Sequence, residues 1–193
     1  MRNVIRIILV VILLGVLFIQ SRPDHFRVER SATMHAPAQT VYAHVVDFHQ
    51  WPAWSPWEHL DPNMKTSYGG PPSGVGSSYH WSGNAKAGEG SMTITAADPG
   101  RRLAIDLEFL KPFKGSNVCT FEFIPDGEGT KVTWALDGKS NFISKAMCVF
   151  MSMDKMVGPD FERGLVSLKG VAEAAPATAD STSTAPAKAA AAK

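Results

Sequence analysis

Residues 47–62 read DFHQWPAWSPWEHLDP and hold three of the chain's five tryptophans, at Trp51, Trp54 and Trp57. The spacing of three would align the indoles on one face of a helix, but two intervening prolines limit any helix to a turn or two. Tryptophan at this density is typical of a ligand-binding wall, of a segment that dips into a membrane, or of a hydrophobic core. The flanking sequence narrows this choice.

The segment before the tryptophans predicts a strand and then a short helix. Residues 26–34 alternate between apolar and polar side chains, as a half-buried strand does. Pro37 suits the first turn of a helix, and Val41, Val45 and Phe48 recur at helical spacing. We therefore expect a helix to lead from the first strand into the tryptophan segment.

From Met64 onward the pattern has a period of two and is interrupted by turn residues, as at 98–100 and 126–129. Strands joined in sequence by short turns form an antiparallel meander with one buried face. The side chains expected on that face are Tyr79 and Trp81; Met92, Ile94 and Ala96; Leu103, Ile105, Leu107 and Phe109; Cys119, Phe121 and Phe123; and Val132, Trp134 and Leu136.

Helical spacing returns in residues 142–173. Gly158 and Pro159 should interrupt it, since proline removes a backbone donor and crowds the preceding turn. We therefore expect a shorter helix and then a long terminal helix that begins near Pro159. The fold class is α+β: a curved antiparallel sheet wrapped around a terminal helix buries both amphipathic faces.

The amino-terminal residues predict a membrane helix. Arg2 and Arg6 precede an uninterrupted apolar run at 7–19. Extended back to Val4, the run spans about 24 Å as a helix, against about 30 Å of bilayer hydrocarbon. The alternatives are an uncleaved anchor and a cleaved signal peptide. We favour the anchor because residues 18–21 match a signal peptidase site poorly.

Positive charge ahead of the apolar run favours an exported, periplasmic or extracellular domain, although Arg22 and Arg27 beyond the run weaken this inference. The other end of the chain is nearly all Ala, Ser, Thr, Pro and Lys, a composition that cannot form a core. We therefore divide the chain into a transmembrane anchor at 1–22, a folded domain at 23–173 and a disordered tail at 174–193.

Charge and cysteine content exclude several classes of function. Lys and Arg number 19 against 18 Asp and Glu, so no overall positive potential attracts nucleic acid. Nucleic acid is therefore not expected as a partner. Cys119 and Cys148 are too few for a disulfide scaffold and lack zinc-ligand spacing. Each is expected to be a small buried hydrophobic residue, although export would permit a bridge between them. No metal and no cofactor are expected.

Four runs of the sequence resemble the START-like, or SRPBCC, superfamily, in its polyketide cyclase/dehydrase-like branch: ATMHAPAQTVYAHVVDFHQWPAWSPW at 32–57, GVGSSYHWSGN at 74–84, GEGSMTIT at 88–95 and MDKMVGPDFERGLVSLK at 153–169. The resemblance covers about residues 26–173. It implies a helix-grip fold, in which seven antiparallel strands wrap around a long carboxy-terminal helix and enclose a hydrophobic cavity. Members include lipid and sterol carriers, coenzyme Q binders, aromatic cyclases and oxygenase domains, so the fold does not fix the function.

A cavity in this fold would be lined by inward strand positions, by methionines from the helical side and by the tryptophan segment. A methionine stripe at helical spacing is more often ordinary core, and Met153 does not share a helical face with the other methionines nearby. We expect one or two of the three clustered indoles to be core and the remaining one to be a lid. The predicted ligand cavity is Trp54, Trp57, Tyr79, Trp81, Met92, Leu107, Phe121, Trp134, Met147 and Met151.

A catalytic acid or base would have to lie in that cavity, where burial could shift its pKa toward neutrality. The candidates are His49, Glu58, His59, His80 and Glu89, and none belongs to a recognised constellation. His80 alternates out of phase with its neighbours, so it should face solvent. The catalytic residues therefore remain unassigned.

The resemblance implies ligand binding more firmly than catalysis. We expect a membrane-anchored domain that binds a hydrophobic small molecule, such as a lipid, an isoprenoid or a polyketide-like ring system, in an internal cavity. The alternatives are a cyclase or dehydratase that uses the same cavity, and a non-catalytic interaction module whose cavity is collapsed. A buried ionisable group facing the cavity would favour the enzyme.

Overall fold

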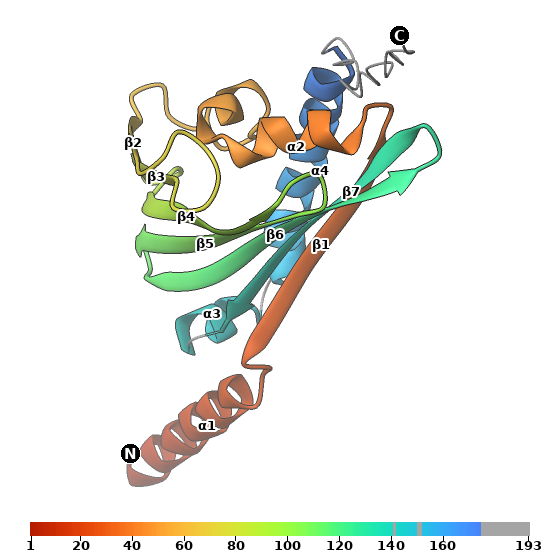
Figure 1. Ribbon diagram of the computed structural model, residues 1–193. Coiled ribbons are helices and arrows are strands. Elements are labelled where there is room, and N and C mark those ends of the chain that lie inside the picture. The colour runs from red at the N-terminus through yellow and green to blue at the C-terminus, as the bar shows by residue number, and fades with distance from the viewer. Residues whose placement is uncertain (141, 150–151, 175–193) are drawn as a thin grey trace, which may run out of the picture.

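The computed structural model describes residues 1–140, 142–149 and 152–174. A single helix stands apart from the domain, and the sheet and the remaining helices form one body (Figure 1). The elements in chain order are α1 (Arg2–Gln20), β1 (His25–Met34), α2 (Ala38–Val46), the 3-10 helix η1 (Phe48–Ala53), β2 (Lys65–Gly69), β3 (Ser78–Ser82), β4 (Glu89–Asp98), β5 (Arg102–Lys111), β6 (Gly115–Asp126), β7 (Gly129–Lys139), α3 (Phe142–Met147) and α4 (Met153–Ala174).

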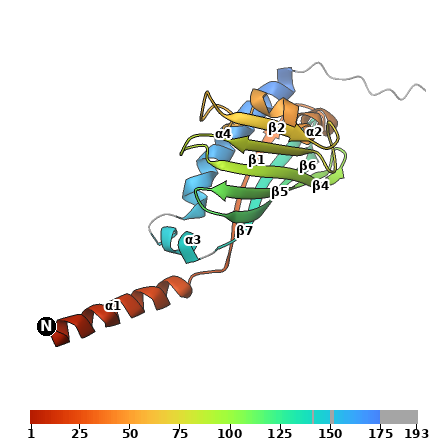
Figure 2. The same ribbon diagram turned by 90° about the vertical axis from the view of Figure 1, so that its left-hand side faces the viewer.

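Within these described residues, seven strands form one antiparallel sheet in the order β1-β7-β6-β5-β4-β3-β2. Strands β2 to β7 pair in sequence as the expected meander, and β1 returns to pair with β7. The long helix α4 packs along β1, and α2 contacts α4, β6 and β7, so helices cover one face of the sheet (Figures 1 and 2). The expected α+β helix-grip architecture, a curved sheet around a carboxy-terminal helix, is confirmed.

Alternation predicts the buried face well in the central strands. All of the inward positions expected on β6 and β7 are buried, including Phe121 and Trp134. The prediction is wrong at Ala96, which is exposed. A register shift between Ile94 and Ala96 turns the next side chain inward, so that Ala97 packs against the core instead.

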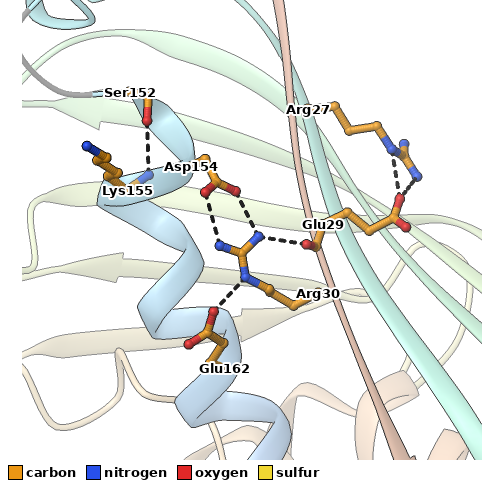
Figure 3. A network of polar contacts seen from close by, with 7 residues as sticks. All are labelled: Arg27, Glu29, Arg30, Ser152, Asp154, Lys155 and Glu162. Carbon is orange, nitrogen blue, oxygen red and sulfur yellow. Dashed lines mark hydrogen bonds and ion pairs between the residues drawn. The ribbon is translucent and has the colours of Figure 1, made fainter.

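The terminal helix begins at Met153, six residues before the expected start at Pro159, which lies inside it. Figure 3 shows that Arg30 of β1 bonds to Asp154 and Glu162 of α4, which precede and follow the proline in the sequence. Arg30 Nη1 donates to Asp154 Oδ1 at 2.7 Å and its Nε donates to Glu162 Oε1 at 2.7 Å. Gly158 permits this approach, since a Cβ there would lie 2.2 Å from Arg30 Nη2.

The amino-terminal helix α1 is longer than the apolar run suggests. Its 19 residues rise about 28 Å, close to the thickness of bilayer hydrocarbon. The window Asn3–Gln20 has a mean hydropathy of 2.5, and the domain covers none of it. The helix is therefore long and apolar enough to cross a membrane, properties that signal sequences share.

The expected disordered tail lies almost wholly outside the described residues, which end at Ala174 as α4 ends.

Candidate functional site

Burial falls along the strands, from one cross-strand row of side chains to the next, toward one end of the sheet. The register places Leu103 beside Phe121 and Phe121 beside Trp134, and this row is fully buried. Two rows further, Met92 pairs with Leu107 and Leu107 with Asn117, and these side chains border open space. The buried face of the sheet is thus closed at one end of the strands and open at the other.

A cavity of about 330 Å³ occupies the hollow part, between the sheet, α4 and the segment that follows η1. This volume lies at the lower end of the range of about 300–1,000 Å³ that is usual for small-molecule sites. Its wall is mostly apolar and aromatic. The cavity therefore has room for a small molecule and offers it a mostly apolar wall.

Most of the predicted cavity residues line it, namely Trp57, Tyr79, Trp81, Met92, Leu107 and Trp134. Among the described residues, Trp54 and Phe121 lie behind this wall, buried against Trp134. Met151 and the side chain of Met147 fall outside the described part of the chain. Met153 and Met156 both line the cavity from α4, contrary to the expected separation of Met153, because residues three apart in one helix share a face.

The three clustered tryptophans have two different environments. Trp51 Nε1 donates to Val45 O and Trp54 Nε1 donates to His44 O, each at 3.0 Å. These carbonyls are in the last turn of α2, where helical partners are lacking, so the two buried indoles cap the helix. Trp57 is only half-buried, packs edge-on against Trp134 at 5.4 Å and faces the cavity. Two of the indoles are therefore core, and the third is part of the wall.

A carboxyl group faces the apolar cavity. Tyr79 Oη donates a hydrogen bond of 2.8 Å to Glu58 Oε1, and both residues line the cavity. Burial is the main cause that raises the pKa of Glu58 above its ordinary value, while the bond from Tyr79 and the proximity of His59 partly oppose it. Burial and the bond to Glu58 raise the pKa of Tyr79 as well, so Tyr79 stays protonated.

The segment that carries Glu58 is fixed by bonds to the β3–β4 connection. The buried Asp61 carboxylate accepts from the backbone amides of Asn63 at 2.9 Å and Asn84 at 2.7 Å. Trp81 Nε1 donates to Ala87 O at 3.1 Å in the same connection. Glu58 therefore occupies a defined position, although it lies outside any helix or strand.

The other candidate acids and bases lie on the surface. His59 and His80 are exposed, as expected for His80. His49 bonds to Asp47 Oδ1 through Nδ1 at 2.8 Å, and Glu89 pairs with Lys111 at 2.6 Å. No cluster of three metal-ligating side chains occurs in the part of the chain that the structure describes. Glu58 is therefore the candidate acid or base that the fold turns inward.

Several polar residues of the wall were missed as lining positions, among them Asn117 and Asp160. Asn117 is in phase with Cys119 and Phe121, so a polar residue at an inward strand position was the available signal. Asp160 lines the cavity from α4 and pairs with Arg163. Cys119 and Cys148 are free thiols, and buried Cys119 accepts a bond from Trp134 Nε1.

The comparisons with known proteins agree with this architecture. A family model described as "Polyketide cyclase / dehydrase and lipid transport" matches residues 25–173. No curated protein gives a significant match.

Solved structures with the same fold are distant in sequence. Protein CV1439 from Chromobacterium violaceum is 17% identical, with a TM-score of 0.53 over 79% of this chain and 99% of that one. Protein SA2116 from Staphylococcus aureus is 14% identical, with a TM-score of 0.58 over 78% of this chain and 94% of that one. The di-domain ARO/CYC protein BexL of the BE-7585A biosynthetic pathway is 16% identical, with a TM-score of 0.58 over 83% of this chain. The match spans 54% of the BexL chain.

Proposed function

Because the chain belongs to the polyketide cyclase/dehydrase and lipid transport family, we propose that its domain binds a hydrophobic small molecule in the cavity between the sheet and α4. The observation that carries this proposal is the largely apolar wall of a cavity of about 330 Å³. An open cavity also argues against the alternative of an interaction module with a collapsed interior.

Desolvation would supply most of the binding energy, at about 25 cal/mol for each Å² of apolar surface buried. The Glu58–Tyr79 pair supplies a polar contact inside this wall and would orient one oxygen of the ligand. A lipid, an isoprenoid or a polyketide-like ring system with a hydroxyl or carbonyl group fits this arrangement.

We also propose that α1 anchors the domain to a membrane, with the domain on the exported side and the three-part organisation of 1–22, 23–173 and 174–193. The length and mean hydropathy of α1 support the anchor. Arg2 and Arg6 at its start support the exported side.

The binding proposal is tested by native mass spectrometry of the full-length chain extracted in detergent. We expect an apolar molecule to co-purify and to be released on denaturation. Leu107→Trp should fill the cavity and prevent uptake of a fluorescent lipid probe, whereas Val118→Trp, on the exposed face of β6, should not. Absence of any bound molecule together with no uptake of the probe would overturn the proposal.

A second candidate function, a cyclase or dehydratase, is supported by Glu58. A carboxyl group whose pKa is raised in an apolar cavity is suited to general acid–base catalysis. Its contact with Tyr79 would keep it oriented toward the substrate. The test is loss of water from a poly-β-ketone thioester, followed by mass: Glu58→Gln should abolish the reaction and still bind the substrate. If the unaltered chain did not dehydrate the thioester, the enzyme proposal would be overturned and ligand binding would be the remaining function.

A further inference from the structure

The point where α1 joins the domain lies at the end of the strands where the cavity is open. β1 begins at His25, which pairs with Lys139 at the end of β7, and Asn117 near the start of β6 pairs with Gly138. The β5–β6 turn is at the same end of the sheet, because Phe109 near the end of β5 pairs with Gly115 at the start of β6. The join of α1 and the open rows of the cavity therefore lie at one end of the domain.

The carboxy-terminal end of α1 contacts α3, which lies beside this end of the sheet. Lys145 Nζ donates to Gln20 O at 3.3 Å and pairs with Asp24. Ser140 N donates to Asp24 O at 2.8 Å. In both views α3 lies between α1 and the sheet (Figures 1 and 2). Residues 21–24 allow at most about 18 Å of extended chain between α1 and β1, so a membrane crossed by α1 must lie close to α3.

Exposed apolar side chains lie at the same end of the sheet. Phe109, Phe113 and Ile143 line the cavity and are also 36%, 50% and 46% exposed, so they form its mouth. Leu110 and Phe142, the chain neighbours of Phe109 and Ile143, are exposed as well. We call these five residues the mouth patch. Exposed apolar groups in one contiguous place are typical of a surface that meets a partner or a membrane.

Lysines surround the mouth patch. Lys111, Lys114 and Lys139 are exposed in the adjoining strand ends and turn, and Lys114 and Lys139 also line the cavity. Aromatic side chains flanked by lysines are typical of a segment seated among lipid headgroups, where the rings enter the acyl boundary and the ammonium groups contact phosphate. This chemistry and the short link to α1 favour a phospholipid leaflet over a protein partner.

We propose that the mouth patch rests on the leaflet from which α1 emerges, so that the ligand passes between the cavity and the bilayer without crossing water. This inference rests on the proposed anchor and on the proposed binding of a hydrophobic ligand. The tether holds the mouth at a high effective concentration at the surface, so each contact between patch and lipid can be individually weak.

The test compares two exposed apolar residues at opposite ends of β6. Phe113, just before the strand, is 50% exposed, and Ile124, near its other end, is 52% exposed. Phe113→Cys and Ile124→Cys are each made in the full-length chain carrying Cys148→Ser, and are labelled with an environment-sensitive NBD maleimide. Burial raises the pKa of the remaining Cys119 to about 12, so this thiol stays unlabelled at neutral pH.

The labelled chains are reconstituted in vesicles of phosphatidylcholine and phosphatidylglycerol and washed with alkaline carbonate. We expect doxyl-labelled lipid to quench the probe at position 113 severalfold more than at 124, and aqueous iodide to show the opposite order. Phe113→Asp together with Ile143→Asp should slow uptake of a fluorescent lipid from the vesicles, whereas Ile124→Asp should not.

The outcomes separate this inference from the functions on which it rests. Retention in the washed vesicles with iodide quenching at 113 as strong as at 124 would overturn the membrane-facing mouth and leave the anchor intact. Loss of the chain from the vesicles would overturn the anchor and this inference together. Quenching by lipid at 113 without any uptake of the fluorescent lipid would confirm the orientation and overturn the passage of ligand.

Discussion

Trp134 at the sealed end of the cavity and Phe113 at its mouth are both large aromatic residues on or beside neighbouring strands, yet they are 1% and 50% exposed. Trp134 stacks on Phe161 of α4 at 4.2 Å and contacts Trp54 and Trp57 edge-on. Phe113 lies in the β5–β6 turn, and the short helix α3 contributes Ile143 to the same mouth. Similar side chains thus stabilise the fold where helices cover the sheet, and remain available to a ligand or a bilayer where they do not.

The largest effect is expected at the sealed end. Trp54→Ala should lower the free energy of unfolding by about 3–5 kcal/mol, because it leaves a cavity in a packed aromatic cluster. Phe113→Ala should change it by less than about 0.5 kcal/mol, as is usual for exposed positions. Urea unfolding of the full-length chain in detergent, followed by near-ultraviolet circular dichroism, gives both values. Similar losses for the two variants would remove the distinction between the ends.

The half-buried Trp57 lies between these extremes and should affect binding more than folding. Trp57→Ala removes an aromatic wall, and we expect binding of a fluorescent lipid probe to weaken by about 1.5–3 kcal/mol, which is about tenfold to a hundredfold. Fluorescence titration measures the change, with Trp54→Ala as the contrasting variant. If Trp57→Ala lost stability like Trp54→Ala and kept full affinity, Trp57 would be core.

Loss of the Arg30 contacts should loosen the part of α4 that lines the mouth side of the cavity. Arg30→Ala removes the bonds to Asp154 and Glu162 on both sides of Pro159 (Figure 3). We expect faster amide hydrogen exchange in residues 153–158 and unchanged exchange near Leu168, which is buried. Arg101→Ala, an exposed pair with Asp98, is the control. Unchanged amide hydrogen exchange in residues 153–158 would show that the first turns of α4 are stable before Pro159 without the Arg30 contacts.

The smallest effect is the pH dependence that Glu58 adds. Burial raises its pKa in the folded protein, so the protonated form is favoured by folding, and stability is lost as pH rises through that raised pKa. Glu58→Gln keeps an acceptor for Tyr79 without the charge. We expect it to melt above the unaltered chain at neutral pH, with the difference shrinking on acidification below the ordinary glutamate pKa. A difference that grows on acidification would contradict the raised pKa.

The sequence predicted the strands of the candidate site better than its loops. Inward positions such as Tyr79, Met92 and Leu107 followed from alternation, since the side chains of a strand face one side at every second residue. Glu58 was named as a candidate acid, but the sequence did not show that its side chain faces the cavity. The segment after η1 has no repeating pattern of apolar and polar residues from which the orientation of a side chain could be predicted. The partner of Glu58, Tyr79, comes from a strand 21 residues later in the chain.

Local pattern by itself determined the order of strands and helices, the buried face of β6 and β7 and the apolar helix at the amino terminus. These features depend on the periodicity and hydrophobicity of neighbouring residues, which the sequence displays directly. Only the tertiary structure decided that α4 starts before Pro159, that Trp54 is core while Trp57 is wall, and that α1 joins the domain at the mouth of the cavity. Each of these depends on contacts between segments distant in the chain, such as Arg30 with Asp154 and Lys145 with Asp24, and such pairings leave no local signal.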